Sequence, residues 1–230
     1  MIYIYGDSHA NYCFNNLHIS HFKYHENSIT MFRIGRDNLI VNFDKEFIVA
    51  TAATAATAAT AATAANAATA ANASTIVFVY GEIDCRCHIH RQKGLDRDED
   101  EIIRELVNNY IDTIKNNTEG LDANIFIVAV IPPTKQSDYE LLNGQITHEY
   151  PFLGSDADRV RYTSKTNRLL ELSSVKYGYT FFNPYDYYTR ADGTLKYELS
   201  DNTVHIGDNM HFLEMFMGAM KGLKDKPHIK

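Results

Sequence analysis

The residues best suited to chemistry in this sequence stand directly after its first apolar run. Residues 1–5 predict a short buried strand, and Gly6, Asp7, Ser8 and His9 follow it. Because loops converge at the carboxyl edge of an open α/β sheet, a serine hydroxyl between an acid and an imidazole is a candidate site there. The alternative for the same turn is a helix N-cap formed by Asp7 or Ser8.

A second group of reactive side chains follows the apolar run 75–80. The segment 81–90 is Gly-Glu-Ile-Asp-Cys-Arg-Cys-His-Ile-His, and thiolate and imidazole together suit zinc. However, side chains one residue apart on an extended segment point to opposite sides, and no second CxxC or HxxxH pair completes a tetrahedral set. We therefore expect no metal site here, but a loop with buried, inert cysteines.

Secondary structure that alternates along the chain must position both groups. Besides the first strand, the pattern predicts strands over 28–34, 75–80, 124–131 and 179–182, and helices over about 98–117, 155–176 and 208–223. Strands alternating with helices, without long hairpin patterns, indicate a parallel sheet covered on both faces. The predicted fold class is α/β, a flavodoxin-like three-layer α/β/α sandwich with a five-stranded parallel sheet.

Three connections of this sheet bear on the site. The second strand is expected to end in a turn at Gly35, at the same edge as Ser8, where glycine permits positive φ or a close approach to a ligand. Residues 13–25 are expected to form a short helix or an irregular loop. Residues 134–154 are expected to form a long loop that covers or shapes a pocket.

Composition limits the classes of protein. The 230 residues are 45% hydrophobic and 22% charged, which is enough for one core, so we expect a single domain over residues 1–230. A formal net charge of -7 argues against nucleic acid or anionic lipid as partners. A strand that begins at residue 2 leaves no room for a signal peptide, and no apolar run approaches about 18 residues. Three cysteines make no disulfide framework, so we expect a cytoplasmic protein without a membrane partner.

A low-complexity tract interrupts the domain at about residues 50–74. It is almost entirely a Thr-Ala-Ala repeat. Alanine favours helix, but a three-residue period on a helix winds the threonines around every face, so no apolar stripe forms. We expect an inserted helix whose ends pack and whose middle is exposed.

Four blocks of this sequence, in order, resemble those of the SGNH/GDSL hydrolase family. They are Gly6-Asp7-Ser8 after the first strand, Gly35 after the second, Gly81-x-x-Asp84 after the third, and an acid-plus-histidine segment before the last helix. The string from Gly81 to His88 also resembles a less studied branch of that superfamily. The resemblance covers the whole domain apart from the Ala/Thr tract, and it implies ester hydrolysis by a serine nucleophile without a cofactor.

The resemblance assigns roles to individual residues. Ser8 would attack an acyl carbonyl, His205 would take its proton, and Asp201 would orient His205. The family usually places the acid three residues before the histidine, whereas Asp201 stands four before. Asp208 and His211 have the usual spacing, but Asp208 is well placed to cap the last helix. We therefore prefer His205 as the base.

The same resemblance implies a site for the oxyanion. The backbone N–H groups of Ser8 and Gly35 would donate to it, and Asp84 belongs to the third block beside them. The family's third donor is commonly an asparagine side chain, but Ile83 occupies that position here. Arg86 is the candidate substitute, and it could instead bind an anionic group of the substrate or pair with Glu82 or Asp84.

These assignments predict an esterase or deacylase that forms an acyl-serine intermediate on a small-molecule ester. Tyr185, Tyr187 and Tyr188 precede the proposed histidine segment, and aromatic faces suit sugar rings, so an O-acylated carbohydrate is a candidate substrate. Two alternatives stay open. The chain could be an acyltransferase that uses the same residues, or a non-catalytic binding module that keeps the fold.

Overall fold

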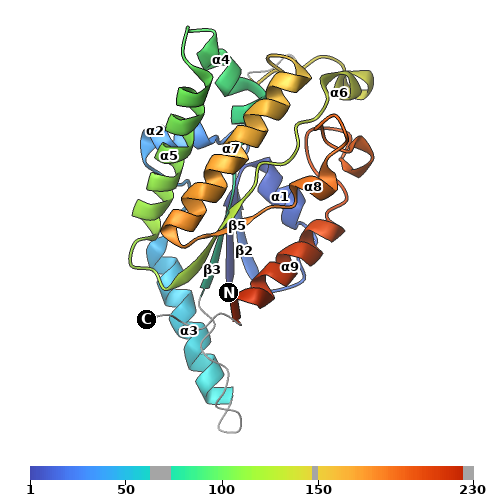
Figure 1. Ribbon diagram of the computed structural model, residues 1–230. Coiled ribbons are helices and arrows are strands. Elements are labelled where there is room, and N and C mark those ends of the chain that lie inside the picture. The colour runs from blue at the N-terminus through green and yellow to red at the C-terminus, as the bar shows by residue number, and fades with distance from the viewer. Residues whose placement is uncertain (63–73, 147–149, 225–230) are drawn as a thin grey trace.

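A computed structural model describes residues 1–62, 74–146 and 150–224 (Figure 1). Within these residues the strands form one parallel sheet in the order β2-β1-β3-β4-β5. The strands are β1 (Ile2–Gly6), β2 (His21–His25), β3 (Ser74–Val79), β4 (Ala123–Val128) and β5 (Thr180–Phe182). The predicted α/β class with a five-stranded parallel sheet is therefore confirmed.

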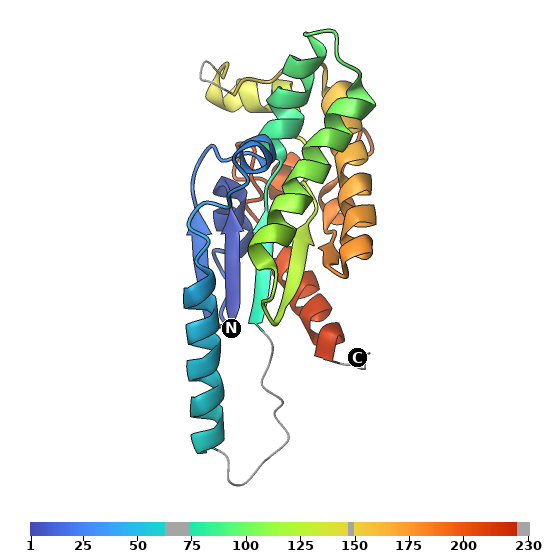
Figure 2. The same ribbon diagram turned by 90° about the vertical axis from the view of Figure 1, so that its left-hand side faces the viewer.

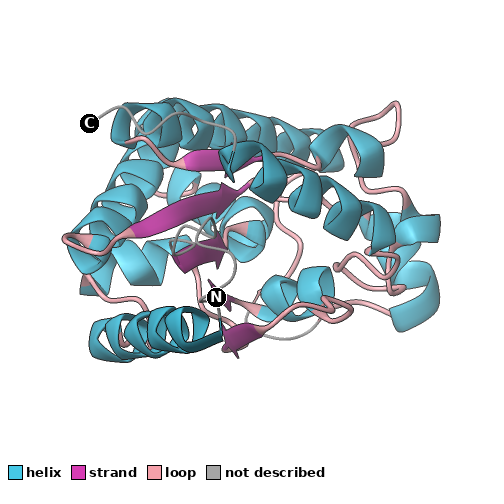
Figure 3. Cartoon of the chain, turned by 90° about the horizontal axis from the view of Figure 1, so that it is seen from below, coloured by secondary structure: helices cyan, strands magenta, loops and turns pink. Residues whose placement is uncertain are grey.

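Helices cover both faces of the sheet, as the view along the strands shows (Figure 3). On one face lie α2 (Met31–Asp37), α3 (Lys45–Ala62), α5 (Glu99–Thr118) and α7 (Asp156–Tyr177). On the other lie α1 (Ser8–Phe14) and α9 (Met210–Lys224). Shorter helices in the connections are η1 (Asp84–His88, a π-helical turn), α4 (Ile89–Lys93), α6 (Gln136–Asn143), α8 (Tyr185–Tyr188) and η2 (Tyr197–Leu199).

Each sheet face has its own core because side chains alternate along a strand. In β1, Tyr3 and Tyr5 belong to the cluster under α5 and α7, whereas Ile2 and Ile4 belong to the cluster under α1 and α9. All four side chains are buried. A strand buried on both sides is typical of a parallel sheet with helices on both faces.

The predicted strand over 28–34 is wrong, because this segment holds α2. Thr30 caps the helix by accepting the N–H of Arg33 at 3.0 Å, and Met31 and Ile34 bury one helical face. The apolar residues of this short run fit a helical period as well as a strand, and the cap decides between them.

The second strand is instead β2, within the segment expected to be a short helix or loop. It pairs in parallel with β1 at the edge of the sheet, where the Phe22 ring stacks on Tyr3 at 5.6 Å and the Tyr24 ring on Tyr5 at 5.2 Å. Aromatic pairs between neighbouring strands stabilise a sheet, and they hold this half-exposed edge strand in register.

Two expected loops contain helices. The segment after β3 forms η1 and α4, and α6 lies within residues 134–154. The longer helices over 98–117, 155–176 and 208–223 are found within about two residues of the predicted bounds, as α5, α7 and α9. Asp98 and Ser155 cap α5 and α7 by accepting backbone N–H groups of their first turns.

The described part of the Ala/Thr tract belongs to α3, which extends past the amino edge of the sheet (Figure 2). Ile48 packs this helix into the core, while the Thr51 and Thr54 hydroxyls donate to carbonyls four residues earlier, at 2.8 and 2.9 Å. Residues 63–73 of the tract lie outside the described residues. Of the helices described, none has both the length and the apolar character needed to cross a bilayer.

Candidate active site

The turn after β1 places Ser8 at the carboxyl edge of the sheet. A Cβ atom on Gly6 would lie 2.6 Å from the Val79 carbonyl oxygen, so only glycine allows this approach of β1 to β3. Asp7 then donates its N–H to the same oxygen at 3.2 Å and accepts the His9 N–H at 2.8 Å. Asp7 is therefore the N-cap of α1, and Ser8 is its first residue. The turn therefore caps a helix and also holds Ser8 at the edge of the sheet, so the two interpretations of this turn are compatible.

Ser8, His205 and Asp201 form a hydrogen-bonded chain. The Ser8 Oγ atom lies 2.8 Å from His205 Nε2, and His205 Nδ1 lies 3.0 Å from Asp201 Oδ2. The Thr203 hydroxyl donates to Asp201 and also lies 3.0 Å from His205 Nδ1. Because His205 Nδ1 faces two oxygens, its proton belongs on that nitrogen, and Nε2 offers a lone pair to the serine hydroxyl.

Burial favours a neutral His205, whereas hydrogen bonds favour an ionised Asp201. Burial and the nearby His9 lower the pKa of His205, and together they outweigh the opposite effect of Asp201. Burial alone would raise the pKa of Asp201, but hydrogen bonds from His205 and Thr203 lower it to about 2. A neutral imidazole against a serine hydroxyl is the state that a general base requires.

The loop before α9 explains the spacing of four between Asp201 and His205. Asn202 takes the left-handed conformation with φ 66°, and an isolated bridge pairs Ser200 with Ile206. This tight loop turns the two side chains toward each other across their separation of four residues. Asn143 in α6 supports it by donating to the Asn202 carbonyl oxygen at 2.7 Å.

Tyr12 is part of the site, although the sequence analysis did not single it out. Its ring stacks on the His205 ring, with centroids 4.0 Å apart and planes 9° apart. Tyr12 stands four residues after Ser8 in α1, so both side chains lie on one helical face. A helix predicted to begin at Ser8 would have revealed this pair.

The Ser8–His205 pair opens into a cavity of about 460 Å³. Its walls combine the loops after β1, β2 and β3 with residues around α6 and before α9. The lining residues are Ser8, Asn27, Ser28, Glu82, Ile83, Arg86, Tyr139, Ile146, Tyr150, Thr203, Val204 and His205. Part of the expected 134–154 loop therefore does shape a pocket.

A buried ion pair forms one wall of the cavity. Arg86 Nε donates to Glu82 Oε1 at 2.6 Å, Arg86 Nη2 donates to Glu82 Oε2 at 3.1 Å, and Nη1 donates to the Tyr150 carbonyl oxygen. Burial opposes charge on both groups, but each holds the other ionised, so the pKa of Glu82 is lowered and that of Arg86 raised. The bonds that Arg86 makes to described residues use three of its five N–H groups.

Gly35 does not lie at this edge, so its predicted role as an oxyanion donor is wrong. It lies within α2, where an added Cβ would be 2.7 Å from the Asn109 Cβ of α5. The small residue allows two helices to pack closely. Asn27 and Ser28 occupy the expected place instead, after the carboxyl end of β2, and Ser28 has a φ of 68°.

Asp84 is also displaced from the role that the third block suggested. It is fully buried and accepts the N–H groups of Met31 and Phe32 at 2.8 and 3.2 Å. The carboxylate thus satisfies the first turn of α2, and it is not among the residues that line the cavity. Ile83 does line the cavity, beside Arg86.

The rival pair of Asp208 and His211 makes other contacts and does not line the cavity at Ser8. The His211 ring stacks on Tyr187 with centroids 3.6 Å apart, and Asp208 accepts the N–H of Met210 at the start of α9. The cavity is not lined by the tyrosines that the sequence analysis named, Tyr185, Tyr187 and Tyr188. Its aromatic lining residues are Tyr139 and Tyr150.

The cysteines of the segment after β3 are buried in the helical turn η1. The Cys85 thiol lies 3.7 Å from the Thr166 hydroxyl, and burial raises the pKa of Cys85 to about 12. Among the described residues, no three His, Cys, Asp or Glu side chains are arranged to hold a metal ion.

Several solved structures are similar to this chain in fold. No protein-family model and no curated protein sequence matches the chain. Three solved structures each cover 96% of it. A Streptococcus pneumoniae protein provisionally named for platelet activating factor has a TM-score of 0.56, 14% identity and 82% of its own chain covered. A provisionally assigned acylhydrolase from Bacteroides fragilis has a TM-score of 0.55, 10% identity and 86% of its own chain covered. A GDSL-like lipase from Bacteroides thetaiotaomicron has a TM-score of 0.53, 9% identity and 88% of its own chain covered.

At these identities the likeness concerns architecture. The five-stranded parallel sheet with helices on both faces is what the comparisons address. The chain therefore has the fold of the SGNH/GDSL hydrolases.

Proposed function

We propose that this protein is a serine ester hydrolase whose nucleophile is Ser8. The observation that carries the proposal is the 2.8 Å contact between Ser8 Oγ and His205 Nε2, with Asp201 3.0 Å from the other ring nitrogen. A serine hydroxyl becomes a useful nucleophile when a neutral base accepts its proton, and this geometry supplies that base. The fold shared with GDSL-like lipases and acylhydrolases supports the same class of reaction.

The proposed reaction has two halves. First, His205 Nε2 takes the Ser8 proton while Ser8 Oγ bonds to the carbonyl carbon of the ester. His205 then returns that proton to the departing alkoxide oxygen, which leaves as an alcohol and leaves the acyl group on Ser8. Second, His205 takes a proton from water, the hydroxide oxygen attacks the acyl carbon, and the proton returns to Ser8 Oγ as the carboxylic acid departs.

Three places in the cavity wall offer donors for the oxyanion. The Ser8 N–H stands in the first turn of α1, where it has no acceptor within the helix. Asn27 and Ser28 line the cavity at the place first expected for Gly35, and we assign the second donor to a backbone N–H of this pair. We assign the third donor to Arg86, since Ile83 replaces the usual asparagine and one missing donor costs about 10² to 10³ in rate.

The cavity also limits the substrate. A volume of about 460 Å³ lies in the lower half of the range for small-molecule sites, roughly 300 to 1,000 Å³. Tyr139 and Tyr150 line it beside the charged Arg86, and this mixture of aromatic faces and hydrogen-bond donors suits a sugar ring. We propose a small ester such as an O-acylated carbohydrate. Transfer of the acyl group to another alcohol would use the same residues.

Labelling with a fluorophosphonate probe, read by intact mass, tests the nucleophile. Wild type should gain one probe adduct, and Ser8→Ala and His205→Ala should abolish or strongly slow that gain. His211→Ala is the matched control, because it removes an imidazole that stacks on Tyr187 away from Ser8, and it should label like wild type. A wild-type protein that does not label would sink the hydrolase proposal and favour a non-catalytic binding module with this fold.

A further inference from the structure

His9 is a buried histidine for which the proposed reaction has no use, although it follows the nucleophile directly. Only 4% of it is exposed. Its Nδ1 lies 3.1 Å from Asp7 Oδ1, and its Nε2 lies 3.1 Å from the Val204 carbonyl oxygen. The ring therefore joins the turn that carries Ser8 to the residue immediately before His205.

Both ring nitrogens of His9 face hydrogen-bond acceptors. A carbonyl oxygen has no proton to give, and Asp7 Oδ1 already accepts the His9 backbone N–H at 2.8 Å. A neutral imidazole carries a proton on only one nitrogen, so either neutral form would set a lone pair against an oxygen. The doubly protonated imidazolium satisfies both contacts at once.

The charges around His9 favour the same state. Asp7 faces it from the β1–α1 turn, Glu82 acts on it from the segment after β3, and His205 faces it from the loop before α9. Burial by itself lowers the pKa of His9, but the two carboxylates and the Val204 carbonyl oxygen outweigh it and raise that pKa. The His205 ring lies 4.6 Å from the His9 ring, centroid to centroid.

We propose that His9 is a positioning residue, kept as an imidazolium, that ties the His205 loop to the nucleophile turn and keeps His205 unprotonated. This inference rests on the proposed function, in which His205 must be neutral to accept the Ser8 proton. Two positive rings 4.6 Å apart repel, so a permanently charged His9 disfavours a proton on His205 before the reaction. It also speeds the return of the proton that His205 holds during the reaction.

Nitrogen NMR of the histidine side chains tests the inference without any substrate. In wild type, both His9 ring nitrogens should still be protonated at pH 7, where an ordinary histidine has lost most of its charge. In His9→Gln, the pKa of His205 should rise by roughly one unit, because the neighbouring cation is gone. His211→Gln makes the same chemical change on α9 and should leave the His205 titration unchanged.

Kinetics provide the second readout. The acid limb of the kcat/KM profile reports the free base, so it should move to higher pH in His9→Gln by the same amount as the NMR titration. A purely structural role would lower Tm without moving this limb. The inference is overturned if wild-type His9 is neutral at pH 7, a result that needs no variant to fold, or if a folded His9→Gln titrates like wild type. An inactive protein with the expected NMR shifts would instead count against the hydrolase proposal alone.

Discussion

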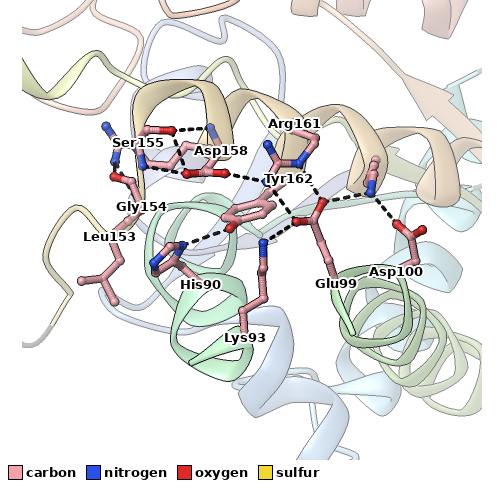
Figure 4. Close-up of polar contacts among 12 residues, drawn as sticks. His90, Lys93, Glu99, Asp100, Leu153, Gly154, Ser155, Asp158, Arg161 and Tyr162 are labelled. Carbon is pink, nitrogen blue, oxygen red and sulfur yellow. Dashed lines mark hydrogen bonds and ion pairs between the residues drawn. The ribbon is translucent and has the colours of Figure 1, made fainter. Parts of the chain in front are cut away.

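Two groups of hydrogen-bonded polar residues in this molecule each contain a carboxylate, but they differ in what surrounds it. One is the Ser8, His205 and Asp201 chain at the carboxyl edge of the sheet. The other is the Glu99 cluster, in which the Glu99 carboxylate accepts Lys93 at 2.8 Å, Arg161 at 2.9 Å and Lys165 at 2.9 Å (Figure 4). It joins α5 and α7 to the end of α4.

The two groups differ in whether hydrogen-bond donors surround the carboxylate completely. Hydrogen bonds from Arg161, Lys93 and Lys165 hold the pKa of Glu99 well below its usual range. The carboxylate is surrounded by donors and exchanges no proton near neutral pH. In the serine chain, His205 lies between Asp201 and Ser8, and Ser8 lines a cavity, so one end of the chain is open to a ligand. A carboxylate surrounded by cationic donors, such as Glu99, stabilises the structure. A hydrogen-bonded chain with one end at a cavity, such as the one that ends at Ser8, can react with a ligand.

The largest effect is expected from Asp201→Asn, which breaks the serine chain while keeping its shape. An amide in place of the carboxylate no longer holds the proton on His205 Nδ1, so kcat/KM should fall by about 10³ to 10⁴. Steady-state hydrolysis of a chromogenic ester measures this.

Asp192→Asn is a matched control for that change. Asp192 and Asp201 both accept the N–H and hydroxyl of the threonine two residues on, and each has a pKa lowered to about 2. Asp192 pairs with Lys135 instead of a histidine, so its variant should keep near wild-type activity. Equal losses of kcat/KM in Asp201→Asn and Asp192→Asn would show that activity depends on the aspartate–threonine turns and not on the contact between Asp201 and His205.

The pH dependence of kcat/KM should report the titration of His205. Since the pKa of His205 is lowered, kcat/KM should fall tenfold per pH unit only below a midpoint that lies under about 6.5. Above that midpoint the base is neutral and the rate should be flat until another group titrates. A midpoint above pH 7 would contradict the neutral state of His205.

Glu99→Gln should alter stability and leave the chemistry intact. Removing this charge leaves three cations with one partner fewer, and we expect a loss of about 1–3 kcal/mol in the free energy of unfolding at pH 7. The pKa of Glu99 is lowered on folding, so its contribution is present above the unfolded value of about 4.3 and is lost as pH falls further. The gap between variant and wild type should therefore narrow on acidification below about pH 4, as measured by urea unfolding.

Glu105→Gln on the same helix is the control for Glu99. Glu105 pairs only with Arg97 among the described residues, and its side chain is 53% exposed, so this ion pair should contribute little. Both variants should retain wild-type kcat/KM. A loss of activity in Glu99→Gln at a temperature where it is folded would show that the two groups are coupled.

The smallest effect is expected from the opposite edge of the sheet. Deleting much of residues 52–70 should leave ester hydrolysis largely intact, because the described part of this tract lies on α3, which extends away from the carboxyl edge. Esterase activity and circular dichroism of the shortened chain measure this. Failure of the shortened chain to fold would mean that the tract is more than a passive insertion.

The fold was predictable wherever several local signals agreed. Capping residues, apolar period and length together indicate α5 and α7, and their bounds are close to those predicted. Residues 28–34 were assigned wrongly because a run of seven residues is compatible with two periods. The true second strand is a half-exposed edge strand, whose apolar signal is weak.

The wrong position of the second strand also affects the predicted site residues. Since the second strand was misplaced, Gly35 received a role that belongs to the Asn27–Ser28 turn. The Glu82–Arg86 pair depends on a separation of four residues, which brings side chains together only once the segment after β3 is helical. The same helical turn directs Asp84 toward the start of α2.

The sequence by itself determined the alternation of strands and helices over most of the chain and the turn after the first strand that carries Ser8, because these depend on residues close in the chain. It also left His205 and His211 as the two candidates for a catalytic base. Only the tertiary structure shows that His205 contacts Ser8, across 197 residues of sequence and next to the tight turn at Asn202. Pattern and propensity describe local geometry, whereas the meeting of distant side chains requires the packed sheet that fixes both ends.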